Sequence, residues 1–551
     1  MNPGEGGLVR KTSAALFLLV ILAAGCGGSS SSSSQEGGTF KLGTSSRIDS
    51  LNPYVAFNQD AYSTFEYIYP TLIQYDKENA KFVPDFAKSW STSADGKTWT
   101  FKTVHGAKWS DGQPLTAEDA AWRINTDIKY KSTGAANDAG LIAHITRAEA
   151  PDPDTLVIHY AAPAGNVLGQ FQQYPIIPKH IWESHTGNKG NDLKTFPNAA
   201  PIVGSGPFTL KEFKKDQIAL FQRYDGFYGP KPKVDAFGLR MFSNDDALVA
   251  ALKAHEIDAI EEVPPTAIDT LKKAGFNVSD VPGSDQTDFI INSSPNKKSH
   301  PELQNLQVRT AFDNAVDRKR IVDVVFLGTA KPAASIIPSA TGDWANPDVQ
   351  PTAFDIDKAN SILEGLGYKR GGDGIRVANG QKMSYEVITP TDLSSANRTF
   401  EILQPDFRKI GVQLTQKALD SSAAFDAMTA PDGKYANFDL ALWDWTGLID
   451  PDFMLSVVTC DQWSGWSDSG FCDKKYDAMY SKQQLTPDQA KRRDIVWQMQ
   501  KYLQSKKPYI WLAALDHVGA VSKNWTDYVD SPQGPFNSLS KLSLSSVHQA
   551  G

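Results

Sequence analysis

Residues 437–457 read NFDLALWDWTGLIDPDFMLSV, and this stretch contains the change of pattern that defines an α/β unit. Large apolar residues occupy every second position from Phe438 to Leu442, the period of two that is typical of a β-strand. The pattern ends at Gly447. Asp450 followed by Pro451 is typical of a helix start, with an N-cap residue and a proline in the first turn. The stretch therefore predicts a strand, a loop and a helix.

Two tryptophans and one aspartate stand where this predicted strand ends. In α/β proteins, ligands bind in the crevice at the carboxyl ends of strands, and aromatic side chains offer them a large rigid contact area. We therefore expect Trp443 and Trp445 to contact a ligand, and replacement of Trp443 to weaken binding with little change in Tm. The alternative is that both tryptophans are core residues. Asp444, between them, could face either way.

Length and composition indicate a globular protein of several domains. At roughly 100–200 residues per domain, 551 residues predict three or four domains. Hydrophobic residues make up 41% and charged residues 21%, so a large core is available. The net charge is −8, with acids and bases interleaved, which argues against a nucleic-acid partner because such a partner requires a basic face.

The amino terminus has the pattern of a secretory signal, which we assign to residues 1–25. Arg10 and Lys11 precede the apolar run Ala14–Ala24, which is too short to span a bilayer. The LAAGC motif that ends at Cys26 resembles a bacterial lipoprotein signal, which implies that Cys26 is lipidated. The alternative is ordinary secretion with Cys26 removed. Residues 26–38 are rich in glycine and serine and predict a flexible tether.

Cys460 and Cys472 are the remaining cysteines of the chain, twelve residues apart in a stretch rich in Trp, Ser and Gly. In an oxidising compartment, an isolated pair of this kind favours a disulfide over a metal site. We therefore predict a disulfide between them.

The middle of the chain alternates predicted strands and helices, which favours α/β layers. Asp95-Gly96 lies between two strand patterns and predicts a hairpin. Thr116 and Asp119 have the spacing of a capping box at a helix start. Apolar residues at helical spacing predict one helix over residues 306–327.

Several motifs occur in a fixed order along the chain: PDFAKSW, DGKTWTFK, KWSDGQPLTAEDAAW, APDPDTLVI, IIPKHIW, VGSGPF, ALKAHEIDAIEEVP, VRTAFDNAVDRKRIV and DPDF. In this order they resemble the extracytoplasmic solute-binding proteins of family 5, the peptide-, nickel- and oligosaccharide-binding receptors of ABC importers. The resemblance covers residues 39–540. It implies a two-lobed α/β fold like that of periplasmic binding proteins (class II, large cluster, with an extra subdomain).

The resemblance also implies two crossing segments that act as a hinge, which we place near Val281–Phe289 and Leu512–Val521. The expected domains are a first part of lobe I at 39–57, the extra subdomain at 58–175, a second part of lobe I at 176–284, lobe II at 285–518, and a return to lobe I at 519–551.

The same resemblance implies that the loop after the first strand contacts the ligand. In this chain the residues at that position are Phe57, Asn58 and Gln59. Dipeptide-binding members carry an Asp before the DPD motif that holds the peptide amine. In this chain Leu448 or Ile449 takes its place, and the nearest acids are Asp444 and Asp450, the latter expected to cap a helix.

Those members also carry an Arg near residues 390–391 that binds the peptide carboxylate. This chain has none there, although Arg398 follows on a predicted helix. We therefore expect free dipeptides to bind poorly, while longer peptides or uncharged oligosaccharides remain candidates.

Motifs of common enzymes are missing from the sequence, including HExxH, GxSxG and a complete P-loop. We therefore expect no catalytic residue, metal or cofactor. The leading hypothesis is a monomeric, lipid-anchored receptor on the outer face of the cytoplasmic membrane, in the periplasmic space. It captures an oligopeptide-like solute and delivers it to an ABC permease and its ATPase. The alternatives are an oligosaccharide receptor and a surface enzyme that shares the fold.

Overall fold

The computed structural model describes residues 37–76, 81–429, 436–529, 531–532 and 541–550. The predicted signal peptide, Cys26 and the tether up to residue 36 lie outside this part of the chain. No helix in these ranges combines the length and the apolar composition that crossing a membrane requires.

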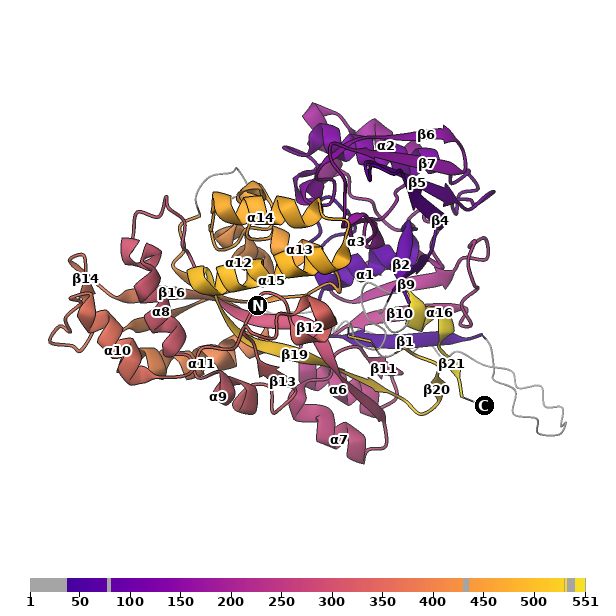
Figure 1. The fold of residues 1–551 in the computed structure, drawn as a ribbon. Coiled ribbons are helices and arrows are strands. Elements are labelled where there is room, and N and C mark those ends of the chain that lie inside the picture. The colour runs from indigo at the N-terminus through magenta and orange to yellow at the C-terminus, as the bar shows by residue number, and fades with distance from the viewer. Residues whose placement is uncertain (1–36, 77–80, 430–435, 530, 533–540, 551) are drawn as a thin grey trace, which may run out of the picture.

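A large mixed sheet runs through the centre of the molecule (Figure 1). Within the described residues it has eleven strands. Their order is β17 (Gln413–Leu419), β16 (Ser384–Pro390), β18 (Leu440–Trp445), β12 (Asn277–Ile291), β19 (Tyr509–Val521), β11 (Ala259–Ile260), β1 (Thr39–Thr44), β10 (Ala236–Met241), β9 (Ile218–Arg223) and β8 (Phe208–Lys214), with β13 (Ala330–Pro332) also paired to β19.

The long strands β12 and β19 run antiparallel and join two lobes. We call the part built on β1 and β8–β11 the first lobe, and the part built on β16–β18 the second lobe. The pairing of β12 with β19 shifts register between Pro282 and Gln286, where the strands pass from one lobe to the other. Both predicted crossing segments lie in these strands; the exact domain boundaries stay a prediction.

Each lobe packs its own apolar core. In the first lobe, Tyr67 meets Phe237 edge to face, with ring centroids 5.2 Å apart. In the second lobe, Phe407 meets Phe289 and Phe312 in the same way. Separate cores allow the lobes to move as two bodies.

A four-stranded antiparallel subdomain extends from the first lobe, at the top of Figure 1. Its strands are β4 (Ala87–Thr92), β5 (Thr98–Thr103), β7 (Thr155–Tyr160) and β6 (Ile145–Asp152), and α2 (Ala117–Tyr130) packs on β6 and β7. The predicted hairpin is confirmed, because β4 and β5 pair across a turn in which Gly96 has φ +69°. The capping box of Thr116 and Asp119 is also confirmed.

The prediction of one helix over 306–327 is wrong. The structure has α8 (Leu306–Asn314) and α9 (Arg318–Val324) instead. The side chain of Asp317 accepts a hydrogen bond from the backbone N–H of Arg320, so it caps a new helix. Both helices bury apolar faces, which is why their combined pattern resembled one longer helix.

The remaining elements surround these sheets. The helices are α1 (Gln59–Ile68), α3 (Val167–Gln172), α4 (Lys179–Trp182), α5 (Asp192–Thr195), α6 (Asp245–Lys253), α7 (Ile268–Lys273), α10 (Ile356–Gly365), α11 (Ser394–Lys409), α12 (Ser421–Met428), α13 (Asp452–Ser456), α14 (Lys474–Gln484), α15 (Gln489–Lys506) and α16 (Leu542–Ser546). The short strands are β2 (Ile73–Tyr75), β3 (Phe82–Pro84), β14 (Val377–Ala378), β15 (Gln381–Lys382), β20 (Trp525–Thr526) and β21 (His548–Gln549).

Candidate functional site

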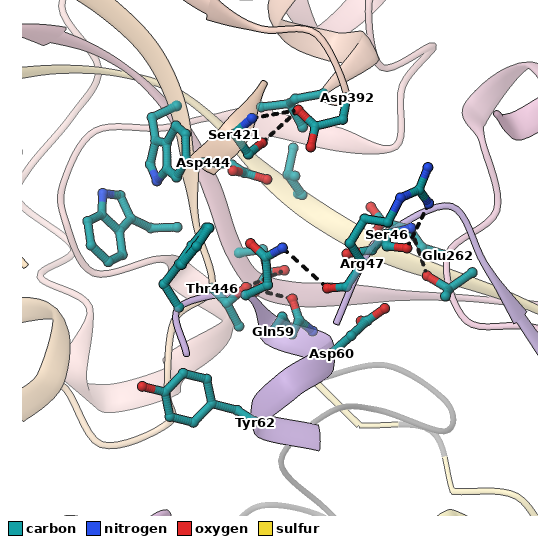
Figure 2. Close-up of a pocket in the computed structure, with 18 of the residues that line it drawn as sticks. Ser46, Arg47, Gln59, Asp60, Tyr62, Glu262, Asp392, Ser421, Asp444 and Thr446 are labelled. Carbon is teal, nitrogen blue, oxygen red and sulfur yellow. Dashed lines mark hydrogen bonds between the residues drawn. The ribbon is translucent and has the colours of Figure 1, made fainter. Parts of the chain in front are cut away.

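A cavity of about 500 Å³ lies between the two lobes. The first lobe contributes the loop after β1, the start of α1 and the segment after β11; the second contributes the end of β18, α12 and the start of α11. The middle of β19 forms part of the wall as well. The cavity thus lies where the sheet passes from lobe to lobe, and Figure 2 shows part of its lining.

All six residues predicted to bind a ligand lie on the wall of this cavity: Trp443, Asp444, Trp445, Phe57, Asn58 and Gln59. They come from two segments that are almost 400 positions apart in the chain. That they contact a solute stays a prediction.

The two tryptophans are mostly buried in the second lobe. Trp443 is 9% and Trp445 7% exposed, and both belong to its apolar core. The indole Nε1 of Trp445 donates a hydrogen bond to Asp468 (3.2 Å), and its ring meets Trp466 edge to face. Burial changes the expectation for Trp443, because its removal would leave a void in the core as well as alter the cavity wall.

Two contacts join the lobes across the cavity. The rings of Phe57 and Phe425 stack with centroids 5.1 Å apart and planes 5° from parallel. The hydroxyl of Thr446 donates to the side-chain oxygen of Gln59 at 2.6 Å (Figure 2). Phe57 and Gln59 therefore hold the lobes together in this conformation.

Asn58 has a local structural task. Its side-chain amide donates to the backbone oxygen of Arg47 (3.2 Å), and its own backbone N–H donates to Asp49 (3.1 Å). Asp49 also accepts from the N–H of Phe57. These bonds fix the loop that presents Phe57 to the cavity.

A group of carboxylates gathers on the cavity wall, and we call Asp60, Glu261, Glu262, Asp285 and Asp444 the acidic cluster. The cluster was not predicted as a group, because its members come from four different elements. Glu261 and Glu262 stand in the quoted ALKAHEIDAIEEVP motif, and two adjacent acids directly after a buried strand are the one sequence signal that could have indicated them.

Enclosure and mutual repulsion disfavour the charged forms of these groups. Burial, then repulsion from Glu262, raises the pKa of Asp60 to about 7, against a hydrogen bond from Thr44 that lowers it. Burial, then repulsion from Asp285 and Glu262, raises the pKa of Asp444 to about 7.

The two glutamates of the cluster are affected in the same direction. The pKa of Glu261 rises well above its usual range, chiefly through burial. Glu262 is exposed toward the cavity, yet the enclosing lobes limit its access to water, and its pKa is also raised.

The cavity wall also contains Asp392 and Arg398. Asp392 accepts hydrogen bonds from the backbone N–H (3.1 Å) and hydroxyl (2.7 Å) of Ser421. Arg398 lies on α11 and lines the cavity, while its guanidinium donates to the backbone oxygen of Val324. An arginine is therefore present at the cavity, although not at residues 390–391.

Asp450 is not available to a ligand. Its carboxylate accepts two hydrogen bonds from Arg492, at 2.6 and 2.7 Å, deep in the second lobe. It also accepts from the N–H of Asp452, so it does assist the start of α13. Leu448 lines the cavity, as expected from its position before the DPD motif.

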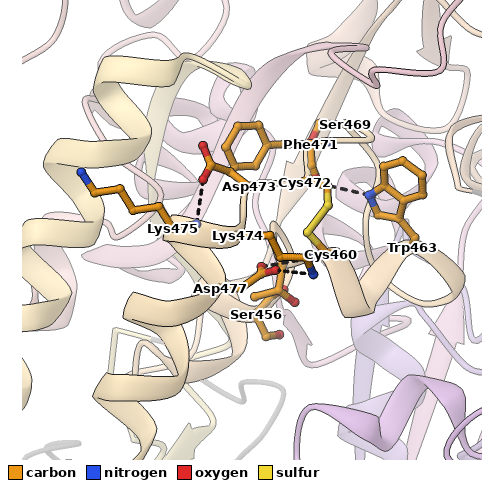
Figure 3. The surroundings of a disulfide bond; sticks show 11 residues. Ser456, Cys460, Trp463, Ser469, Phe471, Cys472, Asp473, Lys474, Lys475 and Asp477 are labelled. Carbon is orange, nitrogen blue, oxygen red and sulfur yellow. Dashed lines mark hydrogen bonds and ion pairs between the residues drawn. A yellow bond between two sulfur atoms is a disulfide. The ribbon is translucent and has the colours of Figure 1, made fainter.

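A disulfide joins Cys460 to Cys472, with Cα atoms 4.6 Å apart (Figure 3). Within the loop that it closes, the indole of Trp463 donates to the backbone oxygen of Phe471 (3.1 Å). This loop also carries Trp466 to the cavity wall. The cross-link therefore braces a segment that shapes the cavity.

Metal ligation is not supported in the parts of the chain that the structure describes. There, no three His, Cys, Asp or Glu side chains lie close enough together to hold a metal ion. The acidic cluster is thus more widely spaced than a set of metal ligands.

Comparison with known proteins gives consistent results. The family model described as "Bacterial extracellular solute-binding proteins, family 5 Middle" matches residues 81–466. The dipeptide-binding protein of Escherichia coli (strain K12) is 25% identical over 489 residues, which cover 85% of this chain and 87% of that protein.

Solved structures share the architecture over nearly the whole chain. The oligopeptide-binding protein AppA from Bacillus subtilis, in complex with a nonapeptide, has a TM-score of 0.83 at 19% identity, covering 94% of this chain and all of the other. NikZ from Campylobacter jejuni, in complex with Ni(L-His), has a TM-score of 0.80 at 23% identity, covering 93% and 99%. At these identities the likeness shows the two-lobed fold.

Proposed function

Because the chain belongs to family 5 of the bacterial extracellular solute-binding proteins, we propose that it captures an oligopeptide-like solute outside the membrane and delivers it to an ABC permease and its ATPase. Solute binding is the activity of the family. Our proposal adds that the solute is oligopeptide-like and that the protein delivers it to a permease.

The cavity between the lobes is the observation that supports this proposal most strongly. Its volume of about 500 Å³ falls within the range of roughly 300–1,000 Å³ that is usual for small-molecule sites. Both lobes contribute to its wall, so a solute inside would touch both and favour the closed arrangement by its higher affinity for that state. Closure of this kind is a hinge motion about the paired strands β12 and β19.

A peptide fits the chemistry of the wall. Aromatic rings on the wall offer apolar contact, while the carboxylates and Arg398 offer charged partners. Solved structures of the same fold include one with a nonapeptide, one with the peptide STSA and one with the dipeptide Met-Leu, which supports a peptide as the solute.

An oligosaccharide is the second candidate, and the aromatic wall favours it. Phe57, Phe425 and Trp443 line the cavity, and aromatic faces are suited to the apolar faces of sugar rings. The carboxylates would then accept hydrogen bonds from hydroxyl groups. Peptide capture accounts better for the excess of acidic over basic groups on the wall.

We also propose that Cys26 carries a lipid that anchors the protein to the outer face of the cytoplasmic membrane. The apolar run, the LAAGC motif and the glycine-serine tether support this. On this proposal the protein acts as a monomer and alters no bond of its solute. Radiolabelled palmitate should be incorporated into the wild type and not into Cys26→Ser; equal labelling would contradict the anchor.

One experiment tests the function itself. The protein is purified without unfolding, and native mass spectrometry identifies any solute that it retains. Isothermal titration then compares tetrapeptide mixtures with oligosaccharides of similar size. Peptide capture predicts a retained peptide and binding of the peptide mixture; binding of sugars alone would establish the second candidate instead.

A further inference from the structure

The cavity wall carries more carboxyl groups than the cations beside them can pair with. We infer that its solute carries an organic cation, a protonated amine or a guanidinium, and that the acidic cluster holds it. This inference rests on the proposed capture of a peptide-like solute and specifies one group that the solute must have.

The members of the cluster converge from both lobes. Asp60 lies on α1 and Glu262 follows β11, both in the first lobe, whereas Asp444 is the last but one residue of β18 in the second (Figure 2). Glu262 repels both Asp60 and Asp444, so all three share one electrostatic environment. Closure of the lobes brings these charges together, and a cation between them would favour the closed state.

One carboxylate oxygen of Asp60 has no hydrogen-bond partner among the described residues. The residue is only 6% exposed and lines the cavity. One of its oxygens interacts with Thr44, but none of the described residues makes a hydrogen bond to Oδ2. A buried carboxylate oxygen without a partner is costly. A donor from the solute would satisfy it.

The cations near the cluster do not supply this donor. Arg47 forms an ion pair with Asp216 (3.4 Å) and donates to the backbone oxygen of Phe242 (2.9 Å). His517 lies 3.6 Å from Asp285 through its Nε2. Among the described residues, these two are the cations that offset the charge of Asp60 and Glu262, against five carboxylates.

Spacing favours an organic cation over a metal ion. In the described part of the chain, the carboxylates do not form a group that could coordinate a metal. An ammonium or guanidinium group presents several N–H donors over a wider area. The aromatic rings of Phe425 and Trp443 line the same cavity and can contact the apolar part of such a solute.

The test uses four versions of one randomised tetrapeptide mixture that contains lysine but no arginine. The first has free amines, the second an acetylated amino terminus, the third acetylated lysine side chains, and the fourth both modifications. Isothermal titration against the full mature chain measures affinity, and native mass spectrometry identifies the bound peptides. The second and third mixtures show whether the cation is the terminal amine or a side chain.

We expect the fully acetylated mixture to bind roughly tenfold or more weakly than the free mixture, because a charge-assisted hydrogen bond contributes about 1.5–3 kcal/mol. Equal binding of the two would overturn the inference and leave peptide capture intact. Binding of none of the four would overturn peptide capture, and the inference with it.

Two variants locate the cation. Glu262→Gln and Asp60→Asn keep the size of each side chain but remove its charge, and each should weaken binding of the free mixture roughly tenfold while leaving the fully acetylated mixture unaffected. Glu401→Gln is the control, because Glu401 is exposed on α11 away from the cavity. Unchanged affinity in both cavity variants would overturn the assignment of the cation to the acidic cluster.

Discussion

Trp443 and Asp444 are neighbours on β18 with opposite surroundings. Trp443 packs into the core of the second lobe, 6.4 Å from the ring of Phe425, and is 9% exposed where it lines the cavity. Asp444 is half-buried and belongs to the acidic cluster. Adjacent residues on a strand face opposite sides, so one segment supplies both apolar packing and charge to the same site.

Trp443→Ala should lower stability and affinity together. Removal of a buried tryptophan costs about 3–5 kcal/mol, and the cavity wall would lose part of its apolar surface. Thermal unfolding and titration with the tetrapeptide mixture measure the two effects, and Trp443→Phe is the control because it keeps a ring in place. A wild-type Tm in Trp443→Ala would show that the side chain is not part of the core.

Glu262→Gln should make the stability of the solute-free protein less dependent on pH. The pKa of each of Asp60, Glu262 and Asp444 is raised in the folded state. The fold therefore binds more protons than the unfolded chain, and its stability falls as the pH rises from about 4 through about 7. The charged groups that act on Glu262, or on which it acts, are Asp60, Glu261, Asp285, Asp444, Asp245 and His517.

Removing the charge of Glu262 relieves this repulsion, so the variant should gain stability relative to the wild type at pH 8 and little at pH 5. Urea unfolding at the two pH values gives the comparison, with Glu401→Gln as the control. A difference between variant and wild type that does not change with pH would contradict the raised pKa values.

At the scale of elements, the joining strands β12 and β19 are the critical part. Gly283 lies in the register shift between them, and a Cβ atom there would come within 2.6 Å of the backbone oxygen of Leu515 and closer still to the ring of His517. The backbones can approach this closely only because the residue has no side chain.

Gly283→Ala should therefore force the strands apart, lower Tm and weaken solute binding. Gly365→Ala is the matched control, because it lies at the end of α10 with nothing within 4 Å of the added atom; it should be neutral or stabilising by up to about 1 kcal/mol. Scanning calorimetry measures the Tm of both variants. A wild-type Tm for Gly283→Ala would show that β12 and β19 can move apart at this point without loss of stability.

The disulfide loop is a second element with a clear test. With Cys460 bonded to Cys472, a thiol reagent added to the folded, unreduced protein should label neither residue. Mass spectrometry of peptides after digestion measures the labelling. Stoichiometric label on either cysteine would contradict the cross-link.

Sequence patterns predicted many element types and fewer of their ends. Local signals such as the capping box at Thr116 act over a few residues and were sufficient there. The break at Asp317 was missed because a continuous apolar face conceals a change of helix. The crossing segment predicted near Val281–Phe289 is only part of β12, because the residues from Asn277 to Pro282 lack a buried apolar face and are held as a strand by pairing with β19.

At the scale of the whole molecule, the residues of the site also divide into those that local sequence patterns indicate and those that only the fold brings together. Trp443 and Phe57 could be proposed from a strand end and a family resemblance. The acidic cluster could not, because only the fold brings Asp60, Glu262 and Asp444 together. Contacts between positions hundreds of residues apart carry no local pattern.

The cross-lobe stack gives a prediction at this scale. Phe57 and Phe425 belong to different lobes, and their rings stack in this structure, so a hinge motion that opens the lobes would separate them. Phe57→Ala should weaken solute binding by roughly 1 kcal/mol, with a smaller effect on Tm than Trp443→Ala, because an aromatic pair contributes about 0.5–1.5 kcal/mol beyond burial. Titration and thermal unfolding test this; unchanged affinity would mean that the stack plays no part in closure.

Closure on a solute is the central claim, and small-angle X-ray scattering tests it most directly. The protein is first freed of retained solute by unfolding and refolding, and scattering is then recorded alone, with the free-amine tetrapeptide mixture, and with an extract of growth medium. We predict a smaller radius of gyration with the peptides. An unchanged radius with both additions would contradict the account.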